Sequence, residues 1–147
     1  MNRRAVCRGE FTLPLPVAEA VPLFTPEGER RWAGPSWDPL YPVADARQDD
    51  SAPGTVFTTE SHGGAATWIV LERRGDGMRY ARVAPGQIAG TIDVRCAEAA
   101  PEQTLVTVEY DVTSLGPDGT AFVGELESGF DAFLEGWRHE ILASLTT

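Results

Sequence analysis

The sequence predicts an α+β fold, in which a strongly curved antiparallel sheet of about seven strands packs around a long C-terminal helix. Residues 121–145 carry apolar side chains at three- and four-residue steps, which is typical of an amphipathic helix. Between residues 55 and 114, β-forming runs alternate with turn signals such as Gly75-Asp76-Gly77, so neighbouring strands are joined by hairpins and run antiparallel. A long helix covering one face of such a sheet gives an α+β layout.

The expected order of elements is β-α-α-β6-α. Pro14 and Pro16 end the first strand because neither can donate to a sheet ladder. Thr25 and Pro26 suit the cap and first position of the second short helix. We expect strands at residues 7–13, 40–46, 55–60, 67–73, 78–84, 88–97 and 105–114, and helices at 17–23, 25–32 and 121–145.

Length and composition favour one globular domain, residues 1–147. Hydrophobic residues make up 42% of the chain and charged residues 23%, an ordinary balance for a folded protein. The net charge of −10 argues against nucleic acid or an anionic membrane as the partner, since both select clustered Lys and Arg. No run approaches the roughly 18 apolar residues of a membrane span, and the first ten residues do not form a signal peptide. We therefore expect a cytoplasmic protein without stable membrane insertion.

The sequence gives no sign of a metal or cofactor. Cys7 and Cys96 lack metal-ligand spacing, and His62 and His139 are the two histidines that could assist them. There is no glycine-rich phosphate loop and no nucleophile elbow. We expect no metal site and no cofactor.

The order of elements resembles the helix-grip (START-like, SRPBCC) superfamily, which includes lipid-transfer START domains, proteins of the birch-pollen allergen type and bacterial polyketide cyclases. Several runs are similar to an uncharacterised bacterial subgroup of that superfamily. These runs are Leu23-Phe24-Thr25-Pro26-Glu27-Gly28-Glu29-Arg30, Trp37-Asp38-Pro39, Gly54-Thr55-Val56-Phe57, His62-Gly63-Gly64, Thr67-Trp68 and Tyr80-Ala81-Arg82-Val83-Ala84-Pro85-Gly86. The resemblance implies the helix-grip fold and a ligand cavity between the sheet and the C-terminal helix. It says far more about fold than about reaction.

The layout of that superfamily also bears on the two cysteines. It pairs the first strand with the last, and the last with the one before it, which places Cys7 and Cys96 two strands apart. At about 4.8 Å per strand this is about 9–10 Å, beyond the ~7 Å Cα separation that a disulfide tolerates. The resemblance therefore implies that both thiols stay free.

Period-two reading of the strands, together with the face of the long helix, suggests which side chains line the cavity. Each of them also fits a plain packing role in the core. The residues expected to contact a ligand are Phe57, Trp68, Tyr80, Arg82, Ile92, Tyr110, Gly129, Phe130, Phe133 and Trp137.

Two features of this set leave alternatives open. Gly129 and Gly136 each cost a helix roughly 1 kcal/mol relative to alanine; they either leave room for a ligand or allow close packing against Trp68 or Tyr110. Arg82 faces inward if Tyr80 does, and it would then need a ligand carboxylate or a protein acid as partner. The apolar pattern of its strand fits the outward orientation as well. Arg82, His62 and Tyr80 are the weak catalytic candidates.

We expect the protein to bind a small hydrophobic ligand, such as a lipid, a polyketide or another aromatic or apolar metabolite. One alternative is an enzyme of the polyketide cyclase or dehydratase kind, which needs converging polar groups such as Tyr80, Arg82 and Tyr110. Another alternative is a protein-interaction module of the co-chaperone type. The sequence does not predict the ligand or the oligomeric state.

Overall fold

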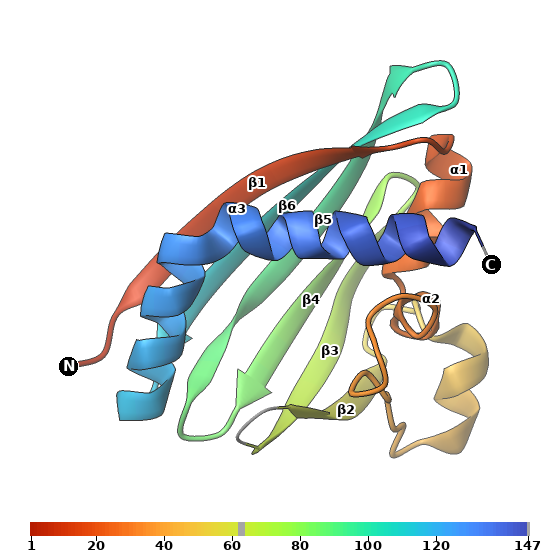
Figure 1. Ribbon diagram of the computed structural model, residues 1–147. Helices are drawn as coiled ribbons and strands as arrows, with labels where there is room; N and C mark the ends of the chain where they lie inside the picture. The colour runs from red at the N-terminus through yellow and green to blue at the C-terminus, as the bar shows by residue number, and fades with distance from the viewer. Residues whose placement is uncertain (62–63, 147) are drawn as a thin grey trace.

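A curved antiparallel sheet wraps one side of a long C-terminal helix in the computed structural model, which describes residues 1–61 and 64–146 (Figure 1). Six strands among these residues form the sheet in the order β1-β6-β5-β4-β3-β2. The strands are β1 (Arg4–Leu13), β2 (Val56–Ser61), β3 (Gly64–Arg74), β4 (Gly77–Ala84), β5 (Ile88–Ala100) and β6 (Gln103–Ser114). The helices are α1 (Val17–Ala20), the 3₁₀ helix η1 (Val21–Phe24), α2 (Pro26–Glu29), the 3₁₀ helix η2 (Ala44–Asp49) and α3 (Pro117–Leu145). The predicted α+β class is confirmed.

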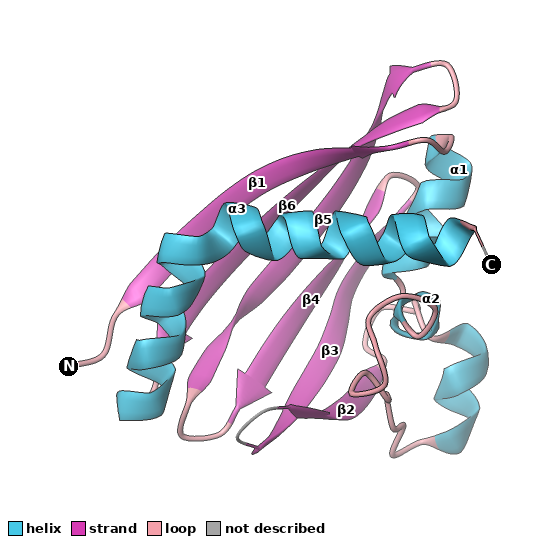
Figure 2. Cartoon of the chain, in the orientation of Figure 1, coloured by secondary structure: helices cyan, strands magenta, loops and turns pink. Residues whose placement is uncertain are grey.

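The alternation of the strands decides which face of the sheet meets the helices. Along β6, every second side chain is buried: Val106, Val108, Tyr110 and Val112. Successive residues of a strand point to opposite faces, so these four side chains share the face on which α3 lies. Figure 2 shows α3 crossing that face, with α1 and α2 near the C-terminal end of α3. The core therefore lies between the sheet and this layer of helices.

The sheet has one strand fewer among the described residues than predicted, because residues 40–46 do not form a strand. Leu40 makes an isolated antiparallel bridge with Thr58, and the chain then turns into η2. The next hydrogen-bonded position of such a ladder, two residues on, is Pro42, which has no N–H to donate. The ladder therefore stops after one bridge.

Helix α3 begins four residues earlier than predicted. Pro117 occupies its first turn, where the missing N–H costs no hydrogen bond. Gly119 is buried against the turn between β4 and β5, and a Cβ there would lie 1.6 Å from the carbonyl oxygen of Gln87. Residues 117–120, which precede the predicted helix, thus open it, and glycine allows its close approach. Among the described residues, no helix combines the length and apolar character needed to cross a membrane.

A second departure from the predicted helix is a kink at Gly129. Its φ of −119° and ψ of 19° are not helical. Figure 1 shows the ribbon of α3 changing direction part-way along its length. Glycine is a common cause of such kinks. The C-terminal part of α3 is thereby directed across the sheet towards α1 and α2.

The register of the sheet confirms that both cysteines are free. Cys7 on β1 faces Tyr110, and Cys96 on β5 faces Val106, so β6 separates the two residues. Burial raises the pKa of the Cys96 thiol to about 12, with Asp76 adding to the effect, and burial likewise raises that of Cys7. The reactive thiolate is therefore scarce at neutral pH.

We accordingly predict slow reaction of the native protein with a thiol reagent such as Ellman's reagent. Unfolding in guanidinium should release both thiols at once. A stoichiometric fast reaction of the native protein would contradict this prediction.

Candidate functional site

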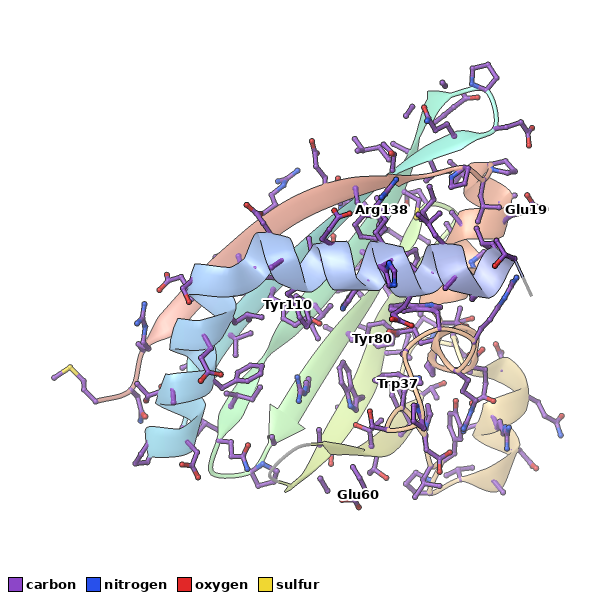
Figure 3. The ribbon with its side chains drawn as sticks, viewed as in Figure 1. Glu19, Trp37, Glu60, Tyr80, Tyr110 and Arg138 are labelled. Carbon is purple, nitrogen blue, oxygen red and sulfur yellow. The ribbon has the colours of Figure 1, made fainter. Side chains whose placement is uncertain are left out.

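A cleft of about 820 Å³ opens between the C-terminal half of α3 and the sheet, and α2 with the loop that follows it forms a third wall. Tyr110 projects from β6 beneath α3, and Trp37 lies beside α2 (Figure 3). We call this space the aromatic cleft. Its lining residues are Glu29, Trp32, Ala33, Pro35, Ser36, Trp37, Asp38, Thr59, Glu60, Trp68, Arg82, Tyr110, Phe133, Gly136, Trp137 and Glu140.

All four tryptophans of the chain line this cleft. Three of their indole N–H groups are engaged by the protein itself. Trp32 donates to the Leu23 carbonyl at 2.8 Å, Trp37 to the Pro26 carbonyl at 2.9 Å and Trp68 to the Thr59 hydroxyl at 3.0 Å. Since these polar atoms are already satisfied, the three indoles offer the cleft mainly their apolar surfaces.

The helix side of the cleft continues this aromatic wall. The ring of Trp137 lies 5.4 Å from that of Trp32 and 5.5 Å from that of Phe133, and Phe133 is 5.7 Å from Tyr110. These separations are within the range of favourable ring pairs. Phe133 is nevertheless 39% exposed. A large apolar side chain left open inside a concave site is a surface that a ligand can cover.

Arg82 supplies a positive charge on the floor of the cleft. Its guanidinium carbon lies 5.1 Å from the centre of the Trp68 ring and 5.8 Å from that of Phe122. None of the ion pairs among the described residues includes Arg82, and its buried Nε has no hydrogen-bond partner there. Burial lowers the pKa of the guanidinium. An arginine remains charged even so, which makes Arg82 a cation held by aromatic faces.

Glu29, at the end of α2, contributes a carboxyl group to the same space. It has neither an ion pair nor a side-chain hydrogen bond within the described part of the chain. Burial raises the pKa of this carboxyl well above its usual range. Burial also raises the pKa of Tyr110, an effect that Arg82 opposes and Glu29 reinforces. Glu29, Tyr110 and Arg82 thus line one cleft, and the charges of Arg82 and Glu29 act on the Tyr110 hydroxyl in opposite directions.

No protein-family model and no curated protein sequence matches this chain. Solved structures do match. A putative uncharacterized protein from Rhizobium leguminosarum is 20% identical, with 95% of this chain and 98% of that one covered at a TM-score of 0.63. Norcoclaurine synthase from Thalictrum flavum, solved with dopamine and hydroxybenzaldehyde, is 8% identical, covering 97% and 88% at 0.63. The Aha1 dimer from Colwellia psychrerythraea is 13% identical, covering 91% and 93% at 0.63.

The chain has the helix-grip fold. The likeness covers nearly the whole chain, and the six-stranded sheet and C-terminal helix account for it. At these identities the comparison shows the fold and leaves the activity open. Within the helix-grip fold, the aromatic cleft occupies the space between the sheet and the C-terminal helix.

The expected ligand-contact residues divide into two groups. Trp68, Arg82, Tyr110, Phe133 and Trp137 line the aromatic cleft. The structure therefore places Arg82 on the inward side, which the strand pattern left open. His62, a weak catalytic candidate, lies outside the described residues.

The other five expected residues do not line the cleft. Phe57 is fully buried behind Trp68, on which it stacks at 5.7 Å, and Ile92 is packed in the core. Tyr80 is buried, and its hydroxyl donates to the Phe24 carbonyl at 2.6 Å. Gly129 and Phe130 line a separate depression beside β1.

The two helix glycines are not sites of close packing. A Cβ added at Gly129 or at Gly136 would meet no atom within 4 Å. Packing against Trp68 or Tyr110, the alternative the sequence left open, is therefore wrong for both. Gly136 borders the aromatic cleft, whereas Gly129 lies at the kink.

Sequence reasoning missed the contributions of α2 and its loop. Trp32, Trp37 and Glu29 are cleft residues that were not expected to contact a ligand. The concentration of tryptophan on both sides of Gly34-Pro35 is the signal that could have indicated them. Glu29 gave no such signal, because an acidic residue in the first turn of a short helix is already explained by its favourable interaction with the helix dipole.

Glu27 holds this third wall in place. Its carboxylate accepts hydrogen bonds from Tyr41 at 2.7 Å, Arg30 at 2.9 Å and Arg47 at 2.8 Å. Arg30 also donates to Asp38 and to the carbonyl oxygen of Pro39, both at 2.6 Å. Desolvation opposes ionisation, but these hydrogen bonds outweigh it and lower the pKa of Glu27. The network ties α2 to the loop that carries Trp37.

We predict that Glu27→Gln lowers the free energy of unfolding by about 1–3 kcal/mol at pH 7, because one carboxylate serves three donors. A carboxyl whose pKa is lowered by folding stabilises the folded state at pH values above its unfolded-state pKa. This contribution is lost as the pH falls through its folded-state pKa. The difference between variant and wild type should therefore shrink in acid. Urea unfolding at several pH values measures it. An unchanged midpoint at pH 7 would contradict the role assigned to Glu27.

Proposed function

We propose that the protein binds a small hydrophobic molecule in the aromatic cleft. The observation that carries this proposal is the open aromatic wall: half-exposed Phe133 and the surfaces of four tryptophans surround about 820 Å³. Small-molecule sites are clefts of roughly 300–1,000 Å³ with mostly apolar linings and a few placed polar groups. Covering apolar surface here contributes about 25 cal/mol per Å². The ligand class includes lipids, polyketides and other aromatic or apolar metabolites.

Native mass spectrometry of protein purified from cells tests this proposal. A mass increment that organic extraction removes is the expected result. Extracted protein titrated with hydrophobic compounds should also show changes in tryptophan fluorescence, because every tryptophan of the chain borders the cleft. Protein that is uniformly empty, together with fluorescence that no compound alters, would overturn the proposal.

A second candidate is an enzyme of the cyclase or dehydratase kind, favoured by the convergence of Glu29, Tyr110 and Arg82. A carboxyl kept protonated by its surroundings can donate a proton to a leaving hydroxyl, and a guanidinium can stabilise a developing oxyanion. Norcoclaurine synthase, solved with two small aromatic compounds, has the same fold. If Glu29→Gln abolishes turnover while the variant still binds the ligand, the result would support an enzyme. Binding without any conversion would favour a carrier.

The remaining expectations stay predictions. They are a protein-interaction role of the co-chaperone type, a cytoplasmic location and the lack of a nucleic-acid partner. The net charge of −10 supports the last of these.

A further inference from the structure

Arg82 differs from the other arginines of the described chain in combining burial with the lack of an anionic partner. Arg30 and Arg74, which are partly buried, each pair with at least two carboxylates. Arg8 and Arg31 have no ion pair but are exposed to water. Among the described residues no carboxylate pairs with Arg82, and its buried Nε has no hydrogen-bond partner there. A buried cation left in this state costs free energy unless something pairs with it.

The surroundings of the guanidinium define what can pair with it. Trp68 and Phe122 lie against the charged group at 5.1 Å and 5.8 Å. Ring contacts satisfy the charge in part but accept no conventional N–H hydrogen bond. Guanidinium N–H groups form a planar fork that matches a carboxylate or another anionic oxygen. The group that completes Arg82 is therefore an anionic oxygen that enters through the cleft.

The rim of the cleft limits how much negative charge can enter. Glu60 and Glu140 line it beside Asp38, which is paired with Arg30, and the chain as a whole carries a net charge of −10. Multiply charged groups such as phosphate esters would be repelled by these carboxylates. Glu29 offers a further polar contact within the same space. An aromatic compound with a single negative charge on oxygen can pair with Arg82 and is repelled less by the carboxylates of the rim.

We propose that the aromatic cleft selects monoanionic aromatic compounds, carboxylates or ionised phenols, with the anionic oxygen on Arg82 and the ring among the tryptophans. This inference rests on the proposed function and names the class of its ligand. Arg82 is the specificity-determining residue of the site.

The test compares three compounds with one ring system: 1-naphthoate, 1-naphthamide and 1-naphthyl phosphate. Their affinities are measured at pH 7 by tryptophan fluorescence and by calorimetry. We expect wild-type protein to bind naphthoate at least about tenfold more tightly than either of the others, the effect of one charge-assisted hydrogen bond. Arg82→Met should remove this preference, so that the variant binds naphthoate and naphthamide with similar affinity. Arg8→Met, which removes an exposed arginine from β1, is the matched control and should keep the preference.

The variants also separate the two levels of the proposal. Arg82→Met removes an unpaired buried charge, so the variant should stay folded, and circular dichroism checks this. Arg82→Lys, which keeps the charge without the fork, should show an intermediate preference. Equal binding of naphthoate and naphthamide, tighter binding of the phosphate, or a preference that survives Arg82→Met would overturn the ligand class and leave the proposed function standing. Protein that is empty on purification and binds none of the three would overturn both.

Discussion

Gly136→Phe should reduce the affinity of the aromatic cleft for its ligand by about 100-fold or more. Gly136 borders the cleft on α3, and a Cβ there would project into open space with no atom within 4 Å. A benzyl group at this position would occupy volume that the ligand needs, next to Phe133 and Trp137. Phenylalanine is also a better helix former than glycine, by roughly 0.5 kcal/mol, so the variant should be at least as stable as wild type. Calorimetric titration and thermal unfolding measure the two effects.

Gly124→Phe provides the matched control for this experiment. It makes the same change on the same helix, at a position that does not line the cleft and where the nearest atom to an added Cβ is Arg3 Nη1 at 3.9 Å. Binding should survive there. If Gly136→Phe is at least as stable as wild type but loses binding, while Gly124→Phe still binds, the glycine at position 136 is retained for the space that it leaves. Undiminished binding by Gly136→Phe would place the ligand elsewhere.

The elements that the sequence predicted well are those in which local pattern and tertiary role agree. Alternation along β6 buries Val106, Val108, Tyr110 and Val112 on one face, as a half-buried strand requires. Residues 40–46 also contain apolar residues, but Pro42 removes the donor that the next rung of the ladder needs. Hydrogen-bond pairing with a distant strand is a tertiary property, and composition alone does not specify it.

The apolar pattern of α3 shows a different limit. Leu126, Phe130 and Ile141 pack in the core, while Phe133 and Trp137, at equivalent spacings, face the cleft. An amphipathic pattern reports which side chains avoid water and does not distinguish a filled core from a cavity wall. The kink at Gly129 makes the lining residues still harder to predict, because an analysis of periodicity assumes a straight helix. Fold class was therefore easier to predict than the identity of the lining residues.

Glu29 illustrates why the chemistry of the site was the hardest part to predict. In sequence it is one acid of a four-residue helix with a favourable position near the N-terminus. In the structure it lines the same cleft as Tyr110 and Arg82, although these residues come from α2, β6 and β4. No short-range pattern brings such residues together. The desolvation of the carboxyl results from the assembled walls of the cleft.

The pH dependence of stability should expose Glu29 directly. Burial raises its folded-state pKa well above the ordinary range of a glutamic acid, so the folded protein holds the proton more tightly than the unfolded chain does. This contribution to stability is fully present below the unfolded-state pKa and is lost as the pH rises through the folded-state pKa. Within that window one proton accounts for a slope of at most about −1.4 kcal/mol per pH unit.

Glu29→Gln should remove this slope. The variant and wild type should be about equally stable near pH 4, and the variant should become increasingly the more stable of the two towards neutral pH. Chemical unfolding between pH 4 and 8 measures the difference, and Glu19→Gln makes the same change on an exposed side chain of α1. The charged or titratable groups that face Glu29 across the cleft are Tyr110, Arg82, Asp38, Glu60 and Glu140. Since Arg82 does not titrate in this range, the slope that disappears in Glu29→Gln and persists in Glu19→Gln belongs to the Glu29 carboxyl. A pH profile that Glu29→Gln leaves unchanged would show that water reaches the carboxyl freely, and the cleft would then lack the desolvated acid that the enzyme candidate requires.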